Sequence, residues 1–135
     1  MYSNILVPIA FEPGQNRDEA IRIARALSND SAKVTVLHVM EEVPSYVAQY
    51  LPEGQLTKNS EEIEARIRGD LAGNDDVDIV VVNGHAGHTI VEFAAKNDVD
   101  CIVVASHRPG LQDYFLGSTA ARVVRHAPCS VHVVR

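Results

Sequence analysis

Short stretches of nearly continuous Val, Ile and Leu recur along the chain, without clean alternation between apolar and polar residues. Parallel strands that are covered on both faces have this pattern. We therefore predict five strands, at residues 4–9, 33–40, 77–83, 100–106 and 130–134.

Between these strands, apolar residues return at the spacing of a helix, so that each segment has one apolar face. The four predicted faces are Ala20, Ile23, Ala24 and Leu27; Ile63, Ile67 and Leu71; Ile90, Phe93 and Ala94; and Ala120, Val123 and Val124, with Ala127 as a further candidate. Strictly alternating strands and helices imply right-handed crossovers and an α/β fold with a doubly wound parallel sheet. We expect one domain over residues 1–135.

Residues 41–59 do not fit this alternation, because their periodicity is weak and they contain two prolines, a glycine and two tyrosines. We predict a long loop there, with or without a short helix. Loops of this length are often functional, and a plain flexible connector is the alternative.

Composition supports a folded, soluble, cytoplasmic protein. The chain has 135 residues, of which 46% are hydrophobic, which suits a globule and not a disordered tail. The first apolar run, residues 5–9, contains Pro8 and is too short for a signal peptide or a membrane span, so we expect no membrane contact. The net charge of −6, with only three lysines, argues against a nucleic-acid partner.

Cysteine and histidine positions give little support for a metal site. Cys101 and Cys129 lack CxxC spacing, and we interpret them as small buried thiols in a reducing compartment, with a redox or metal role as the alternative. His85 and His88 lie three residues apart in a glycine-rich turn, but no further ligand joins them in sequence, and zinc needs three or four. His38 lies within a predicted strand, where we expect a packing or interface role.

A ligand site is expected where the winding of an open α/β sheet reverses, beyond the carboxyl ends of the strands. With strand order 3-2-1-4-5, this point lies between the first and fourth strands, so the loops after Ile9 and Ala105 are candidates. The second loop leads to Gly117, Ser118 and Thr119, where small residues and hydroxyls stand beside the unpaired amides of a helix start. Such a start favours an anion such as phosphate.

Two further residues of the second loop could contact that anion. Arg108 offers a charge-assisted hydrogen bond, and His107 is either a phosphate contact or a structural donor. The alternative for Gly117 and Ser118 is a simple turn and helix cap. Catalytic patterns are absent: the chain has no G-x-S-x-G sequence and no Walker A lysine, so we do not expect efficient phosphoryl transfer.

Several of these segments resemble one known family. Residues 103–135, which include ASHRPG and FLGSTAARVVRHAPCSVHVVR, resemble the carboxyl end of universal stress proteins. NILVPI and VTVLHV resemble that family's first and second strands, so the similarity covers essentially the whole chain. The ASHRPG form and the spacing to Gly117 are similar to the small F/G-like subgroup. The resemblance implies an adenine nucleotide alpha hydrolase-like fold that binds ATP or AMP, with Mg accompanying ATP.

The family's nucleotide fingerprint, G-x2-G-x9-G-[ST], is incomplete here. Ala105 and Arg108 stand at its first two glycine positions, and the interval to Gly117 is one residue short, whereas Gly117 and Ser118 match. By resemblance, the nucleotide-binding residues are Pro8, Ile9, Ala10, Val39, Ser106, His107, Arg108, Gly110, Gly117, Ser118 and Thr119.

Ala10 stands where binding members usually have an aspartate that contacts the nucleoside. Losing one polar contact to a buried ligand group costs about 1–3 kcal/mol, or roughly ten- to hundredfold in affinity. Glu12 is the nearest substitute. The resemblance thus predicts a nucleotide pocket that binds weakly.

The last predicted strand is apolar and would be a pairing hazard if it lay uncovered at an edge. In universal stress proteins the fifth strands pair antiparallel across a two-fold axis, which implies a homodimer through Val131, His132, Val133 and Val134; a monomer with a short capped edge is the alternative. Three functions follow as hypotheses: a nucleotide-responsive stress-response dimer, a ligand-independent dimeric interaction module with a degenerate pocket, and a slow hydrolase.

Overall fold

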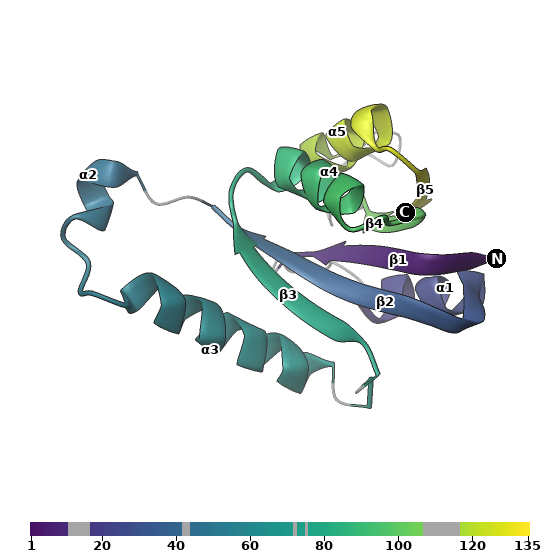
Figure 1. Ribbon diagram of the computed structural model, residues 1–135, viewed down its shortest axis with the longest axis horizontal. Coiled ribbons are helices and arrows are strands. Elements are labelled where there is room, and N and C mark those ends of the chain that lie inside the picture. Colours follow the sequence, from purple (N-terminus) through teal and green to yellow (C-terminus); the bar gives the residue numbers. More distant parts are fainter. Residues whose placement is uncertain (11–16, 42–43, 72, 75, 107–116) are drawn as a thin grey trace.

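Five parallel strands form one sheet in the order β3-β2-β1-β4-β5, which confirms the predicted doubly wound topology (Figure 1). The strands of this computed structural model are β1 (Tyr2–Ile9), β2 (Ser28–Met40), β3 (Asp78–Asn83), β4 (Cys101–Ala105) and β5 (Ser130–Val134). The structure describes residues 1–10, 17–41, 44–71, 73–74, 76–106 and 117–135. β2 begins at Ser28, five residues earlier than predicted, because its polar start pairs with the first residues of β1 (Tyr2 with Ser28).

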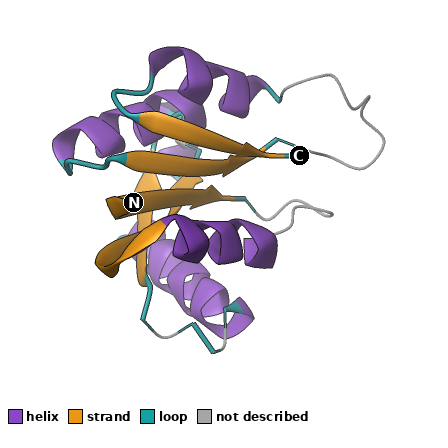
Figure 2. Ribbon diagram, turned by 90° about the vertical axis from the view of Figure 1, so that its right-hand side faces the viewer, coloured by secondary structure: helices purple, strands orange, loops and turns teal. Residues whose placement is uncertain are grey.

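Helices cover both faces of the sheet (Figure 2). They are α1 (Arg17–Leu27), α2 (Ser45–Ala48), α3 (Gln55–Asp70), α4 (Ala86–Lys96) and α5 (Ser118–His126). Side chains of α1 and α3 join one buried cluster, and those of α4 and α5 join the other. The central strand feeds both clusters, because Ile5 and Val7 point to the first and Leu6 to the second. This two-sided burial explains why the strands are apolar without alternation.

The predicted helix faces are correct in most positions. Ala20, Ala24, Ile67, Ile90 and Ala120 are all buried. The prediction is wrong for Val124, which is 47% exposed, because the inner face of α5 is centred on Ala120 and Val123 and the next residue turns toward solvent.

The segment predicted as a loop, residues 41–59, contains more helix than expected. It holds the short helix α2, and α3 begins at Gln55, directly after Gly54 in a left-handed conformation with φ +79°. The prediction placed the helix start too late because the first residues of α3 are mostly polar and show no apolar helical face in the sequence. The carboxyl half of α3 packs on β3, and α2 stands away from the sheet (Figure 1).

A polar clamp joins the start of β1 to the turn before β4. The carboxylate of Asp100 accepts hydrogen bonds from the backbone amides of Ser3 (2.9 Å) and Asn4 (3.0 Å). The Asp100 amide donates to the Asn4 carbonyl at 2.9 Å, and the Asn4 side chain donates to the carbonyls of Asn97 and Asp98. These bonds set the register in which Ile5 pairs with Cys101.

Both cysteines are unpaired thiols, and Cys101 is buried as expected, whereas Cys129 is half-buried. Burial, with smaller contributions from Cys129 and Asp100, raises the pKa of Cys101 to about 11. Burial also raises the pKa of Cys129. Both thiols therefore stay protonated at neutral pH and are poor nucleophiles.

We expect Cys101 to resist a thiol reagent such as dithionitrobenzoate at pH 8 in the folded protein and to react fully once the protein is unfolded. Because the folded pKa lies above the ordinary value of 9.0, the unfolded thiol ionises first. The stability that this group contributes is complete below about pH 9 and is lost as the pH rises toward 11. Timed labelling, with Cys101→Ala as the control that removes the slow class, checks this. Two thiols that react at once in the native protein would contradict it.

Candidate functional site

The carboxyl ends of the central strands meet at one edge of the sheet. β1 pairs with β4 on one side, through Ile5 with Cys101 and Leu6 with Ile102, and with β2 on the other. The winding therefore reverses between β1 and β4, where the sequence predicted it. Ligands of open α/β sheets bind at this point.

The chain leaves β4 and returns to α5 at nearly the same place. Ser106 is fixed by its amide, which donates to the Val134 carbonyl at the end of β5 at 3.0 Å. A Cβ atom added at Gly117 would lie 3.7 Å from the Ser106 carbonyl oxygen, so the two residues are neighbours. Three predicted site residues, His107, Arg108 and Gly110, lie outside the described part of the chain.

Helix α5 starts at this edge without a side-chain cap among the described residues. Its N-cap is Gly117, in an extended conformation, and the Gly117 carbonyl accepts from the Ala121 amide at 2.8 Å. The preceding amides of the first turn have no acceptor within the helix. Ser118 is exposed and Thr119 half-buried, and both residues bring a hydroxyl to this first turn. The arrangement presents partial positive charge and hydrogen-bond donors, which suits an anion.

The remaining predicted residues lie at the ends of β1 and β2. Pro8 and Ile9 are buried, Ala10 is half-buried directly after β1, and Val39 is half-buried one residue before the end of β2. These residues lie at the carboxyl ends of the neighbouring strands β1 and β2. The structure thus places eight of the eleven predicted residues on the strand ends and the α5 start of one edge.

His38 has a role at this edge that sequence reasoning missed. Its Nδ1 lies 3.0 Å from the Ile9 carbonyl oxygen. Because a carbonyl oxygen can only accept, Nδ1 must carry the proton in this contact. The ring thereby fixes the last residue of β1 against β2. The parallel pairing of Ile9 with His38 explains the contact, and the sequence alone does not give that pairing.

The turn between β3 and α4 reaches the same edge through Gly84. Its amide donates to the Met40 carbonyl at 2.9 Å, which joins the ends of β2 and β3. Its φ is +150°, and an added Cβ atom would lie 2.3 Å from the Thr89 hydroxyl oxygen. Only glycine fits both the conformation and the space.

Helices α4 and α5 approach each other closely near their starts. A Cβ atom added at Gly87 would lie 2.7 Å from Cδ of Arg122, so the side-chain stem of Arg122 lies across the first turn of α4. The side chain of Arg122, from the middle of α5, therefore lies beside the start of α4. The spacing of small residues in α4 was the only sequence signal for it.

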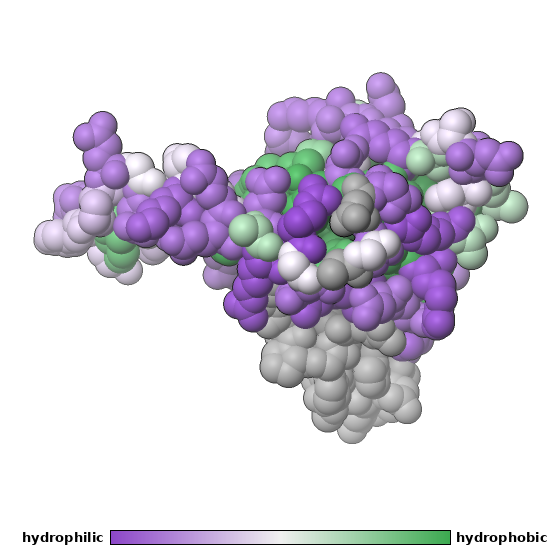
Figure 3. Space-filling model, turned by 90° about the horizontal axis from the view of Figure 1, so that it is seen from below, coloured by the Kyte–Doolittle hydropathy of each residue, from purple (hydrophilic) through white to green (hydrophobic). Residues whose placement is uncertain are grey.

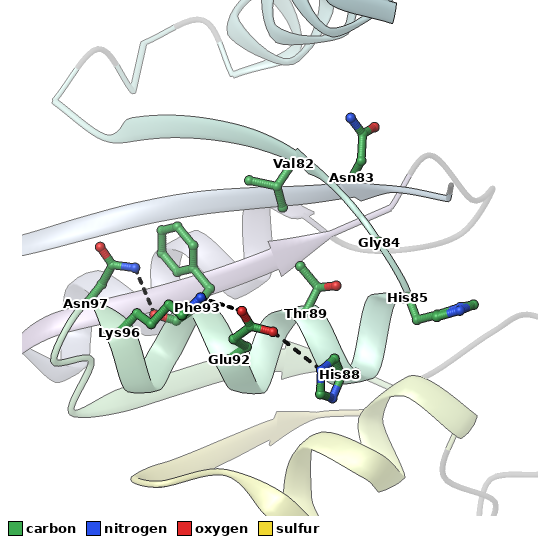
Figure 4. Close-up of a pocket in the computed structure, with 10 residues that line it drawn as sticks. All are labelled: Val82, Asn83, Gly84, His85, His88, Thr89, Glu92, Phe93, Lys96 and Asn97. Atoms are coloured by element: carbon green, nitrogen blue, oxygen red, sulfur yellow. Dashed lines mark hydrogen bonds and ion pairs between the residues drawn. The ribbon is translucent and has the colours of Figure 1, made fainter. Parts of the chain in front are cut away.

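The two histidines of this turn do not come together as metal ligands. His88 lies 3.4 Å from Glu92, which also pairs with Lys96 at 2.5 Å, while His85 points away from them (Figure 4). In the described part of the chain, no three His, Cys, Asp or Glu side chains gather into a metal-binding group. The same residues contain no helix that is long and apolar enough to cross a membrane.

The doubly wound parallel sheet places this chain in the class of open α/β proteins. Proteins of this class bind ligands beyond the carboxyl ends of the strands, where the winding reverses. Comparison with known proteins then identifies the family. The model of the universal stress protein family matches residues 1–135, and the chain belongs to this family. A universal stress protein from Methanothermobacter thermautotrophicus is 31% identical over 144 residues, which cover all of this chain and 97% of the relative.

Solved structures agree on the fold. The universal stress protein UspA from Lactobacillus plantarum superimposes with a TM-score of 0.73 at 24% identity, covering 99% of this chain and 98% of that chain. A universal stress protein in complex with cAMP superimposes with a TM-score of 0.69 at 21% identity, covering 99% and 97%. The adenine nucleotide alpha hydrolase-like fold expected from the resemblance is therefore confirmed.

Proposed function

We propose that this universal stress protein binds an adenine nucleotide, ATP or AMP, at the carboxyl ends of β1 and β4 and acts as a dimeric regulatory or protective module of the cytoplasm. The return of Gly117 to the side of Ser106, with the start of α5 open at the reversal point, carries this proposal. The solved relative in complex with cAMP supports the adenine nucleotide as the ligand class.

Each part of the edge has a role in this proposal. The first-turn amides of α5 and the hydroxyls of Ser118 and Thr119 hold the phosphates, with His107, Arg108 and Gly110 completing the loop. The backbone of Val39 contacts the adenine, a contact that does not depend on the side chain. The floor under the nucleoside is Pro8 and Ile9, held in place by His38. Mg, when it accompanies ATP, neutralises phosphate charge.

Dimerisation is proposed through β5, which lies at one edge of the sheet. Ser130 and His132 are exposed on this strand, and Val131, Val133 and Val134 are half-buried. Antiparallel pairing of two β5 strands across a two-fold axis would satisfy the edge amides and cover these valines. The alternative, a ligand-independent dimeric module, keeps this interface and gives the nucleotide edge no role.

The affinity for nucleotide should rise when the missing carboxylate is restored. We expect Ala10→Asp to tighten ATP binding roughly ten- to hundredfold, because it adds one hydrogen bond to a sugar hydroxyl at the floor of the edge. Isothermal titration calorimetry of both proteins with ATP and Mg²⁺ measures this.

The control is Ala95→Asp, which adds the same charge on an exposed position of α4 and should leave the affinity unchanged. If neither the native chain nor Ala10→Asp gives heat at millimolar ATP, the ligand-independent alternative replaces this proposal. Equal affinities in the native chain and Ala10→Asp would instead show that residue 10 does not face the nucleoside.

A further inference from the structure

Exposed apolar side chains of the described residues are concentrated on one short segment. We call α2 and the turn after it, residues 44–51, the arm. Tyr46 is 69% exposed, Tyr50 is 82% exposed and Val47 is also exposed, whereas the rest of the described chain adds only Met1 and Val124 to this group. The arm stands out from the body of the molecule (Figure 1, Figure 3).

Among the backbone hydrogen bonds of the described residues, those made by the arm have both partners within the arm. The Pro44 carbonyl accepts from the amides of Val47 and Ala48, and the Tyr50 amide donates to the Val47 carbonyl at 3.0 Å. No residue of α2 is buried. A helix of one turn is not stable in water without packing, so an exposed apolar arm of this kind calls for a surface that covers it.

The same chain carries an open groove between β3 and α4, which we call the β3–α4 groove. Val82 of β3 and Phe93 of α4 point into it and form an apolar floor (Figure 4). Its volume is about 460 Å³. Its lining also includes His88, Glu92 and Lys96 of α4.

This groove exists because the helices are distributed unevenly over the sheet. α4 packs on β2 and α5, and α3 packs on β3 from the opposite face. The face of β3 that carries Val80 and Val82 is therefore only partly covered by α4, and both side chains are half-buried. The groove is thus a gap in the second helical layer, at the sheet edge opposite β5.

We propose that the arm of one molecule docks in the β3–α4 groove of a second copy of this chain, reciprocally, so that a two-fold contact forms at the β3 edge. Tyr46, Val47 and Tyr50 fill the space over Val82 and Phe93. Each buried tyrosine contributes roughly 150–250 Å², so two arms and the two groove surfaces facing them bury on the order of 1,600 Å². Stable dimers need about 1,200–2,000 Å².

The charges on the two surfaces are compatible with the apolar contact. The chain has no lysine or arginine between Lys33 and Lys58, and the arm is flanked by Glu41 and Glu53. In the groove Lys96 is paired with Glu92 at 2.5 Å, so these two charges cancel within the lining. An acidic arm therefore meets a lining without net charge and avoids the like-charge repulsion that contact between two arms would bring.

The connection of the arm to α3 directs it away from the groove of its own chain. α3 packs through Ile63 and Ile67 on the face of the sheet opposite the groove. Ser60 of α3 also contacts Met40 at the end of β2, with Oγ 3.7 Å from Sδ, which fixes the base of α3 there. α2 is consequently carried out past the sheet, where a second molecule can receive it.

Sedimentation equilibrium of the full chain tests the contact without reference to nucleotide. Because β5 provides the other proposed contact, we expect Tyr46→Ser/Tyr50→Ser to lower the mass of the native assembly at the same concentration to that of a dimer paired through β5, or to that of a monomer where the arms form the only contact. Val124→Ser, which removes the exposed apolar side chain of α5, is the matched control and should leave the mass unchanged. An unchanged mass for the arm variant would overturn the proposal.

Cross-linking distinguishes exchange between copies from closure onto the same chain. Tyr50→Cys and His88→Cys proteins are mixed under mild oxidation. We expect a disulfide-linked species of twice the chain mass, in a larger amount than either protein forms by itself. The chain with only its native cysteines is the control. In a chain carrying both substitutions, a disulfide within one molecule in dilute solution would show self-closure and would contradict exchange, as would the absence of any cross-link in the mixture.

Discussion

Replacing Gly84 with alanine is expected to lower the free energy of unfolding by about 3–5 kcal/mol. Two costs combine. A side chain is strained at φ +150°, and its Cβ would overlap the Thr89 hydroxyl oxygen at 2.3 Å. Relief requires rotation of the Thr89 side chain, a shift of α4 or loss of the bond from the Gly84 amide to Met40. Urea denaturation followed by circular dichroism measures the change.

Two variants separate these costs. Gly69→Ala, in α3 with no atom within 4 Å of the added Cβ, should be neutral or stabilise the chain by about 0.5–1 kcal/mol. Gly84→Ala/Thr89→Ala removes the overlap and leaves the backbone strain, so it should recover part of the loss. A Gly84→Ala protein as stable as the native chain would show that this turn is not as tight as the structure has it.

Asp100→Ala is expected to cost about 2–3 kcal/mol, because it removes an ionised acceptor from the amides of Ser3 and Asn4. The Asn4 amide is part-buried, so it loses its partner where water only partly replaces it. The same urea titration measures this. The loss of stability should be accompanied by faster hydrogen exchange at the start of β1.

The matched control is Asp78→Ala at the start of β3. Its carboxylate lies 3.9 Å from Lys33, and both side chains are more than half exposed, so the effect should be within about 0.5 kcal/mol. If the two substitutions cost the same, the clamp on β1 contributes no more than an ordinary surface charge.

The strands were predictable because a strand that is buried on both faces needs nearly continuous apolar residues, and such runs are visible in the sequence. Ile5, Leu6 and Val7 are all fully buried, and continuous apolar residues allow only such a strand or a buried helix segment of similar length. The alternation of strands with helices then limits the topology to very few arrangements. The observed order β3-β2-β1-β4-β5 is one of these arrangements.

Features that depend on register were not predictable. The polar residues at the start of β2 carry no strand pattern, and they are extended because β1 lies beside them. The contact of His38 with Ile9 likewise needs the pairing of β1 with β2. α3 begins at Gln55 in a stretch with little apolar surface to bury, so local conformation at Gly54 determines its start more than packing does.

The candidate site was predicted from topology more than from its residues. The reversal point between β1 and β4 needed only the strand order, and Gly117 needed only its place before a small-residue helix start. In contrast, the close approach of Arg122 to Gly87 depends on the packing of α5 against α4, which are far apart in the sequence. The positive φ of Gly84 depends on the geometry of the turn between β3 and α4.

Because Ser106 and Gly117 are neighbours, the rest of the fold holds the two ends of residues 107–116 together, whatever the length of the stretch between them. Doubling the length of a loop between fixed ends adds only about 0.6 kcal/mol of closure entropy. Evolution can therefore lengthen, shorten or replace residues 107–116 without disturbing the register of β4 with β5. Relatives can therefore differ in this stretch while their scaffold stays the same, and a chain that carries residues 107–116 of another member is expected to keep the same fold.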